Sequence, residues 1–162
     1  MDYTQFEKTA ANIRTGIIKA IHSAGSGHPG GSLSAADIVT ALYFKEMNIE
    51  PKEPKMKGRD KFILSKGHAG PVQYAALAER GYFPKEDIHK VPEIEMSTGS
   101  LGQGFSVAAG MAMAGKLDQD PARIYVLLGD GEIQEGLIWE TAMSAAHYKL
   151  DNLCAMVDYN RV

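Results

Sequence analysis

The chain has 162 residues, of which 44% are hydrophobic and 23% are charged. This is the composition of an ordinary globular protein, and the length is sufficient for one good hydrophobic core, so a single domain over residues 1–162 is expected. The net charge of -3 gives no general electrostatic reason to expect a nucleic acid or an anionic membrane as a partner.

The cysteine content and the N-terminus indicate a compartment. Cys154 is the only cysteine, so the chain has no internal disulfide, and the apolar run from Leu153 to Val157 predicts a buried thiol. The first seven residues lack the basic and apolar pattern of a secretion signal, and no apolar stretch approaches the length that spans a membrane. A cytoplasmic protein that binds neither membranes nor nucleic acids is therefore expected.

The first third of the chain is predicted to be helical. A helix from about Thr4 to Ala24, with a capping box at residues 4–7, is indicated by apolar residues on one helical face: Phe6, Ala10, Ile13, Ile17 and Ile21. The stretch 25–32 is rich in glycine and proline and predicts a loop. Ser34 can cap a second helix that runs toward Asn48.

The remainder of the chain alternates between predicted strands and helices. Lys61–Ser65 reads as a short buried strand, and a helix through Arg80 follows it. Ile124–Leu128 and Leu153–Val157 are apolar runs typical of strands, and helical periodicity from Ile133 to Leu150 separates them. A strand, helix, strand succession predicts parallel strands joined by a crossover. The expected fold class is α/β, with a parallel sheet flanked by helices.

Polar residues follow two of these predicted strands. Gly129, Asp130, Gly131 and Glu132 come directly after the first strand of the pair, and Asn160 follows the second. Because the carboxyl ends of parallel strands meet at one edge, the crossover would return Asn160 beside Asp130. Carboxylate and amide oxygens suit Mg²⁺ or Ca²⁺, and Mg²⁺ often completes its shell with water and phosphates. The glycines would let a diphosphate approach the backbone closely.

The Gly-Asp-Gly run followed by a distant asparagine resembles the cofactor fingerprint of thiamine diphosphate enzymes. Four stretches also resemble transketolase motifs, in the order in which that family has them: SGHPGG at 26–31, LSKGH at 64–68, TGSLGQG at 98–104 and GEIQEG at 131–136. The chain is therefore similar to the first part of a transketolase, or to the N-terminal subunit where transketolase is encoded as two chains. The resemblance implies a thiamine diphosphate-binding fold of the diphosphate-binding type, here incomplete at its C-terminus.

The resemblance also implies which residues bind the cofactor and its metal. Asp130, Asn160 and the main-chain carbonyl of Val162 would hold the divalent metal, which would be Mg²⁺ or, alternatively, Ca²⁺ or Mn²⁺. Thiamine diphosphate would contact a wider set of residues: His68, Gly99, Ser100, Leu101, Gly129, Asp130, Gly131, Glu132 and Asn160.

Three residues would take part in catalysis by the same resemblance. His28 and His68 would line the pocket for the cofactor and the donor substrate, where imidazoles can bind phosphate or hydroxyl oxygens and exchange protons near neutral pH. Glu135 matches a family carboxylate that links paired active sites across a subunit interface.

The implied reaction is the reversible transfer of a two-carbon ketol unit between sugar phosphates. A C-terminal transketolase subunit or domain would supply the pyrimidine-binding part, including the glutamate that activates the cofactor. The chain is therefore expected to be inactive alone and to assemble as a homodimer or heterotetramer.

Two departures from the family pattern keep other interpretations open. A second Gly-His-Pro loop is absent, because residues 87–96 run almost directly into Ser97, and His89 is not expected to replace its histidine. The chain also stops two residues after Asn160. One alternative is a non-catalytic fragment or module that binds thiamine diphosphate and Mg²⁺. Another is a related thiamine enzyme such as deoxyxylulose phosphate synthase or dihydroxyacetone synthase.

Simpler roles are available to the acidic and amide residues of the predicted site. Asp130 and Asn160 could serve only to form a turn or cap a helix, which both residue types do well. Glu132 and Glu135 fall where a helix is predicted to begin, and acidic side chains there interact favourably with the helix dipole without any catalytic duty.

Overall fold

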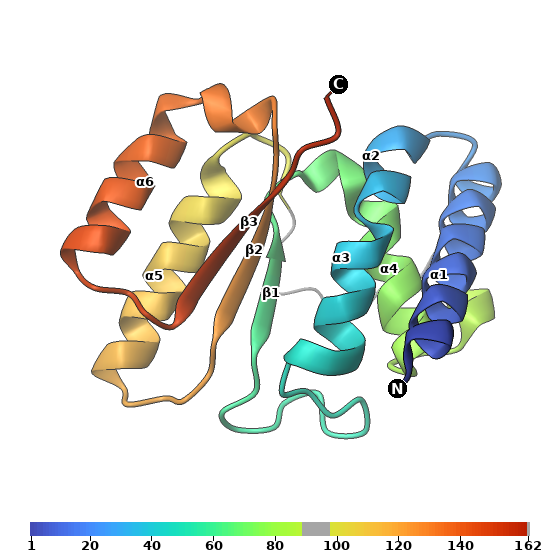
Figure 1. The fold of residues 1–162 in the computed structure, drawn as a ribbon, viewed down its shortest axis with the longest axis horizontal. Helices are drawn as coiled ribbons and strands as arrows, with labels where there is room; N and C mark the ends of the chain where they lie inside the picture. Colours follow the sequence, from blue (N-terminus) through green and yellow to red (C-terminus); the bar gives the residue numbers. More distant parts are fainter. Residues whose placement is uncertain (89–97, 162) are drawn as a thin grey trace. The chain divides into compact units, whose positions relative to one another are not determined.

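The computed structural model describes residues 1–88 and 98–161, which belong to two compact units (Figure 1). Unit 1 combines Met1–Pro54 with His68–Glu93, and unit 2 combines Lys55–Gly67 with Ile94–Val162. The description of residues 1–162 as a single domain stays a prediction. In the described part of the chain, no helix is long and apolar enough to span a membrane.

Unit 1 is helical. Its elements are α1 (Tyr3–Ala24), α2 (Pro29–Ser34), α3 (Ala36–Ala41), the π-helix η1 (Leu42–Glu46), α4 (Gly70–Arg80) and the 3-10 turn η3 (Lys85–Asp87). The buried face of α1, which includes Ile13 and Ile17, packs against α3 and α4 (Figure 1). At Gly16, an added Cβ atom would lie only 3.1 Å from the Cβ of Ala75, so the absence of a side chain there lets α1 and α4 approach closely.

The predicted first helix is confirmed, but its cap differs. Asp2 caps α1: its carboxylate accepts a hydrogen bond from the Gln5 amide at 2.8 Å, and the Gln5 side chain accepts one from the Asp2 amide at 3.0 Å. Asp2 and Gln5 have the same spacing as the pair predicted from Thr4, and the helix begins two residues earlier than that pair would allow.

The predicted loop at 25–32 is shorter than expected, because α2 begins at Pro29. Proline suits the first position of a helix, since its fixed φ is helical and its missing N–H would have no partner there. Ser34 does not cap the next helix; its hydroxyl donates to the Gly31 carbonyl at 3.3 Å. The second helix, predicted to run from Ser34 toward Asn48, is instead divided into α3 and η1.

Unit 2 contains the parallel sheet. Its strands β1 (Lys61–Leu64), β2 (Ile124–Gly129) and β3 (Leu153–Asp158) lie in the order β1-β2-β3, and Ile124 pairs with both Lys61 and Leu153. The predicted strand, helix, strand unit with parallel strands is confirmed. Helix α5 (Gln103–Leu117) packs against the sheet, and α6 (Gly136–His147) lies beside α5 (Figure 1). Their shared core includes the following buried residues: Ile63, Phe105, Ala108, Val126, Leu128 and Ile138.

Unit 2 departs from the prediction in two places. The helix expected from Ile133 to Leu150 is the shorter α6, which the 3-10 turn η4 (Glu132–Gln134) precedes. The Cys154 thiol was expected to be buried, but Cys154 is half-buried, because β3 has only β2 as a neighbour in the described sheet. Two features of the sequence, His89 and the run from there to Ser97, lie outside the described residues.

Candidate functional site

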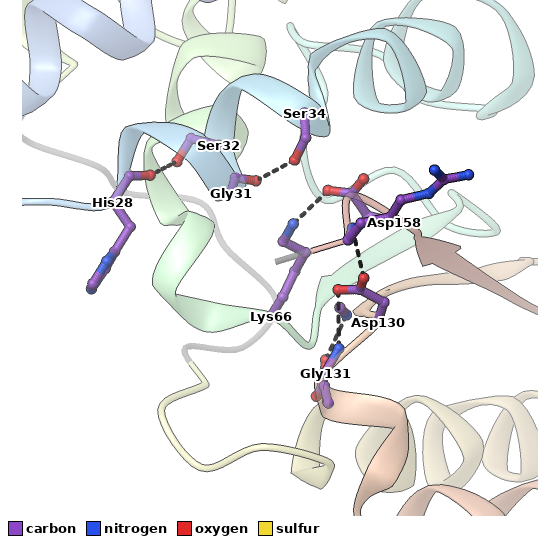
Figure 2. A network of polar contacts seen from close by, with 11 residues as sticks. His28, Gly31, Ser32, Ser34, Lys66, Asp130, Gly131 and Asp158 are labelled. Carbon is purple, nitrogen blue, oxygen red and sulfur yellow. Dashed lines mark hydrogen bonds and ion pairs between the residues drawn. The ribbon is translucent and has the colours of Figure 1, made fainter.

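The carboxyl ends of the strands in unit 2 bring the predicted metal residues to one edge. Gly129, the last residue of β2, pairs with Asp158, the last residue of β3. Just beyond, the Asp130 carboxylate accepts a hydrogen bond from the Arg161 amide at 2.8 Å and another from the Gly131 amide at 3.0 Å (Figure 2). Asp130 therefore touches the backbone of the segment that carries Asn160, as the parallel crossover predicts.

The oxygen atoms at this edge are suitable for a hard divalent cation. Each carboxylate oxygen of Asp130 accepts one backbone N–H and keeps a second lone pair. Both Asp130 and Asn160 are half-exposed. Among residues 1–88 and 98–161, no three His, Cys, Asp or Glu side chains are placed to share a metal ion. A cation at this edge would therefore also need oxygen ligands from amides, the main chain and phosphates. Such a donor set fits Mg²⁺, which commonly uses one or two carboxylates with phosphates and water. The predicted ligand Val162 lies outside the described residues.

The Thr98–Gly102 segment lies beside this edge. The Thr98 hydroxyl lies within hydrogen-bonding distance of two carbonyls at the end of β1, those of Leu64 at 2.7 Å and Ser65 at 3.1 Å. A Cβ atom on Gly67 would overlap the Thr98 carbonyl, so glycine is required at this position. The predicted cofactor residues Gly99, Ser100 and Leu101 follow, and all three are exposed. Their backbone is therefore available to a ligand.

Lys66 and Asp158 form a buried ion pair that the sequence reasoning missed. The Lys66 ammonium lies 2.5 Å from Oδ2 of Asp158, and the side chains are 1% and 7% exposed (Figure 2). A signal was available, because Lys66 and Asp158 have opposite charges and each directly follows an apolar run predicted to be a strand, and a parallel sheet brings the ends of its strands together.

The two glutamates of the GEIQEG motif have different surroundings. Glu132 is 2% exposed and accepts hydrogen bonds from Ser65, Gly102 and Gly129. Glu135 is exposed at the N-cap position of α6, and its side chain makes no capping hydrogen bond. The first carboxylate is thus held by the protein, while the second is open to solvent.

In unit 1, the structure brings together the two predicted catalytic histidines. The ring centroids of His28 and His68 lie 5.8 Å apart, with the rings nearly perpendicular at 87°, and both residues are exposed. His28 is the N-cap residue of α2, where its carbonyl accepts a hydrogen bond from the buried Ser32 hydroxyl at 3.0 Å (Figure 2). His68 stands in the 3-10 turn η2 (Gly67–Ala69), directly before α4. This contact pairs the histidine of the SGHPGG motif with the histidine of the LSKGH motif.

Comparison with protein families identifies one match. Residues 6–162 match the family described as transketolase, thiamine diphosphate binding domain. The 6-deoxy-6-sulfo-D-fructose transketolase subunit SqwG of Clostridium sp. (strain MSTE9) is 47% identical over 93% of this chain and 60% of its own length. One of the apulose-4-phosphate transketolase subunits, from Phocaeicola vulgatus, is 40% identical over the whole chain and 63% of its own length. Human transketolase is 43% identical over 95% of this chain and 27% of its own length.

The alignment with the Phocaeicola vulgatus protein extends over 177 positions, although the present chain has 162 residues. That relative therefore carries residues without a counterpart here, which is consistent with the shorter connection before the TGSLGQG motif.

Solved structures share the fold. Transketolase from Leishmania mexicana superposes with a TM-score of 0.86 at 28% identity, over 94% of this chain and 27% of that one. Transketolase from Pichia stipitis superposes with a TM-score of 0.84 at 35% identity, over 94% of this chain and 26% of that one. The expected thiamine diphosphate-binding α/β fold is thereby confirmed. The chain spans less than two thirds of the length of these relatives. It belongs to the transketolase family and corresponds to the N-terminal, thiamine diphosphate-binding part of a transketolase.

Proposed function

We propose that this chain binds the diphosphate group of thiamine diphosphate, together with a divalent metal, at the carboxyl ends of β2 and β3. The observation that carries the proposal is the contact between the Asp130 carboxylate and the Arg161 amide at 2.8 Å. It joins the Gly-Asp-Gly turn to the segment of Asn160 at one edge of a parallel sheet, the usual place for phosphate ligands in such folds. Asp130 and Asn160 would hold the metal, and the Gly131 amide would meet the diphosphate.

The remaining predicted residues would orient the cofactor and the substrate. The exposed backbone of Gly99, Ser100 and Leu101 would lie along the cofactor rings. Thiamine diphosphate, when bound, supplies the electron sink for breaking and making the carbon–carbon bond. His28 and His68 would hold substrate hydroxyl or phosphate oxygens and move protons there, because imidazole exchanges protons near neutral pH.

The proposed reaction is the transfer of a two-carbon ketol unit between sugar phosphates, completed by a partner that carries the pyrimidine-binding part. Two relatives are named as transketolase subunits, which supports a two-chain enzyme. Glu135, exposed at the start of α6, is available to a second copy across an interface, as a homodimer or heterotetramer requires.

A second candidate for the substrate comes from one relative. The protein that is 47% identical is named for 6-deoxy-6-sulfo-D-fructose, in which a sulfonate takes the place of a phosphate. Both groups are anionic and accept hydrogen bonds, so the same kind of site could hold either. A panel of donors that includes this sulfosugar, sugar phosphates, and the substrates of deoxyxylulose phosphate synthase and dihydroxyacetone synthase distinguishes these activities by their products.

Calorimetric titration of the purified chain with thiamine diphosphate, with and without Mg²⁺, tests the site itself. Metal-dependent binding is expected, and Asp130→Ala is expected to abolish it. Asp118→Ala is the matched control, because it removes an exposed carboxylate at the C-terminal end of α5 in the same unit. Absence of binding by the wild type, both alone and with a pyrimidine-binding partner chain, would contradict the proposed function. Ketol transfer by the isolated chain would contradict the need for a partner.

A further inference from the structure

Glu132 is a buried carboxylate that contacts three separate segments of unit 2. Its Oε1 accepts a hydrogen bond from the Ser65 hydroxyl at 2.5 Å and another from the Gly102 amide at 2.8 Å. Its Oε2 accepts one from the Gly129 amide at 3.0 Å. Ser65 follows β1, and Gly129 ends β2. Gly102 ends the segment 99–102, called the cofactor loop here because it carries the predicted cofactor residues Gly99, Ser100 and Leu101. One side chain thus ties the loop to the ends of two strands.

The cofactor loop needs such an external partner. Gly102 is the N-cap residue of α5 and has a φ of 85°, in the left-handed region that favours glycine. Since glycine has no side chain, α5 has no side-chain cap of its own. Glu132 instead binds the Gly102 amide and places a negative charge near the N-terminus of α5, where the helix dipole favours it.

The burial of Glu132 argues against direct contact with a ligand. Only 2% of the residue is exposed, and both carboxylate oxygens already accept hydrogen bonds from protein groups. None of the three donors carries a charge, so the carboxylate is stabilised by hydrogen bonds, as a buried charge must be. In the segment that ends at Gly102, residues Gly99, Ser100 and Leu101 are exposed and can contact a ligand themselves.

We propose that Glu132 is a positioning residue for thiamine diphosphate binding: it fixes the Gly99–Gly102 backbone against the ends of β1 and β2 and does not touch the cofactor. This inference rests on the proposed function. It replaces the cofactor-binding role that the sequence suggests for Glu132 with an indirect one.

Two substitutions of Glu132 remove these hydrogen bonds to different extents. Glu132→Gln keeps only one acceptor oxygen. Its NH2 group is a donor and must face the amide N–H of either Gly102 or Gly129, so that hydrogen bond is lost. The remaining hydrogen bonds are weaker because the acceptor no longer carries a negative charge. Thiamine diphosphate affinity is expected to fall by about tenfold, the effect of losing one charge-assisted hydrogen bond. Glu132→Ala, which removes all three bonds, is expected to weaken binding further.

The experiment has two readouts, both with the purified chain. Hydrogen exchange without cofactor is expected to show faster exchange at the Gly102 or Gly129 amide in each variant, and calorimetry with Mg²⁺ gives the affinity for thiamine diphosphate. Glu140→Gln removes an exposed carboxylate on α6 and is expected to change neither readout. Ile17→Ala removes buried volume from α1 in unit 1, whereas the loop belongs to unit 2, so it is expected to change the unfolding temperature but not the affinity.

The outcomes separate this inference from the proposed function. A folded Glu132→Ala variant that binds thiamine diphosphate within twofold of the wild type would overturn the positioning role. Unchanged exchange at both glycine amides would overturn it as well. If neither Glu132 variant folds, Ser65→Ala removes one of the three donors and is expected to change both readouts in the same direction to a smaller extent. A wild type that fails to bind the cofactor contradicts the proposed function, while the exchange comparison still decides whether Glu132 holds the loop.

Discussion

Lys66 and Asp158 join the two outer strands of the sheet through an ion pair, with 2.5 Å between Nζ and Oδ2. Lys66 follows β1 and Asp158 ends β3, so the pair spans the carboxyl end of β2, which lies between them. Asn160 comes two residues after Asp158. The ion pair therefore fixes the end of β3, from which the chain continues to the proposed metal ligand Asn160.

Breaking this ion pair is expected to destabilise the protein strongly. Lys66→Met would leave the Asp158 carboxylate buried without its cation, which costs about 3–5 kcal/mol of unfolding free energy. Lys66→Met combined with Asp158→Asn is expected to lose less than Lys66→Met alone, because it also removes the buried negative charge. Urea denaturation of the single and double variants measures this difference.

The control is the exposed pair of Lys116 and Asp151, whose charged atoms lie 2.8 Å apart. Lys116→Met is expected to have a much smaller effect, because solvent screens exposed charges. Equal losses from Lys66→Met and Lys116→Met would show that burial does not set the strength of the first pair.

Glycine at position 104 is expected to be required, whereas glycine at 110 in the same helix is not. A Cβ on Gly104 would lie 2.6 Å from the backbone Cα of Ser65, so Gly104→Ala must push α5 away from the end of β1. This is expected to cost about 1–3 kcal/mol. Gly110 has nothing within 4 Å of its Cβ position, and Gly110→Ala is expected to stabilise the helix by about 0.5–1 kcal/mol. Thermal unfolding of both variants tests the opposite signs; destabilisation by both would contradict the steric argument.

Stability is expected to fall at alkaline pH through Tyr125. Burial, and then the charge of Asp60, raise the pKa of the Tyr125 phenol above its ordinary value of 10.0. Because the pKa is higher in the folded state, the stabilisation is fully present below about pH 10, the unfolded value, and is lost as pH rises through the folded pKa. Tyr125→Phe is therefore expected to flatten the decline of unfolding free energy above about pH 10. Tyr3→Phe, at an exposed position, serves as the control, and an equally steep decline in Tyr125→Phe would refute the assignment.

Asn160 is expected to act through its oxygen atom. Asn160→Ala would remove a proposed metal ligand and is expected to raise the Mg²⁺ concentration needed for thiamine diphosphate binding by about tenfold or more. Asn160→Asp keeps an oxygen ligand that suits Mg²⁺ and is expected to retain most of the affinity. Titration of Mg²⁺ at fixed thiamine diphosphate measures both. Unchanged Mg²⁺ dependence in Asn160→Ala would instead indicate that Asn160 only shapes the turn.

Much of the fold was predictable from the sequence, because it is encoded locally. The apolar runs at Ile124 and Leu153, with a helical pattern between them, were sufficient to predict two parallel strands and a shared edge at Asp130. Boundaries were less predictable where several residues compete for one role. Asp2 and Thr4 both offer capping spacing at the start of α1, and Pro29 can stand in a loop or begin a helix.

Local residue patterns were sufficient to predict the parallel α/β fold, the family through four ordered motifs, and which residue types stand after each strand. The contacts that these residues make could be seen only once the chain was folded. Glu132 meets a hydroxyl 67 residues away in the chain, and Lys66 meets a carboxylate 92 residues away. The physical reason is that periodicity reports only which face of an element is buried, whereas the partner of a buried charge depends on how distant segments pack.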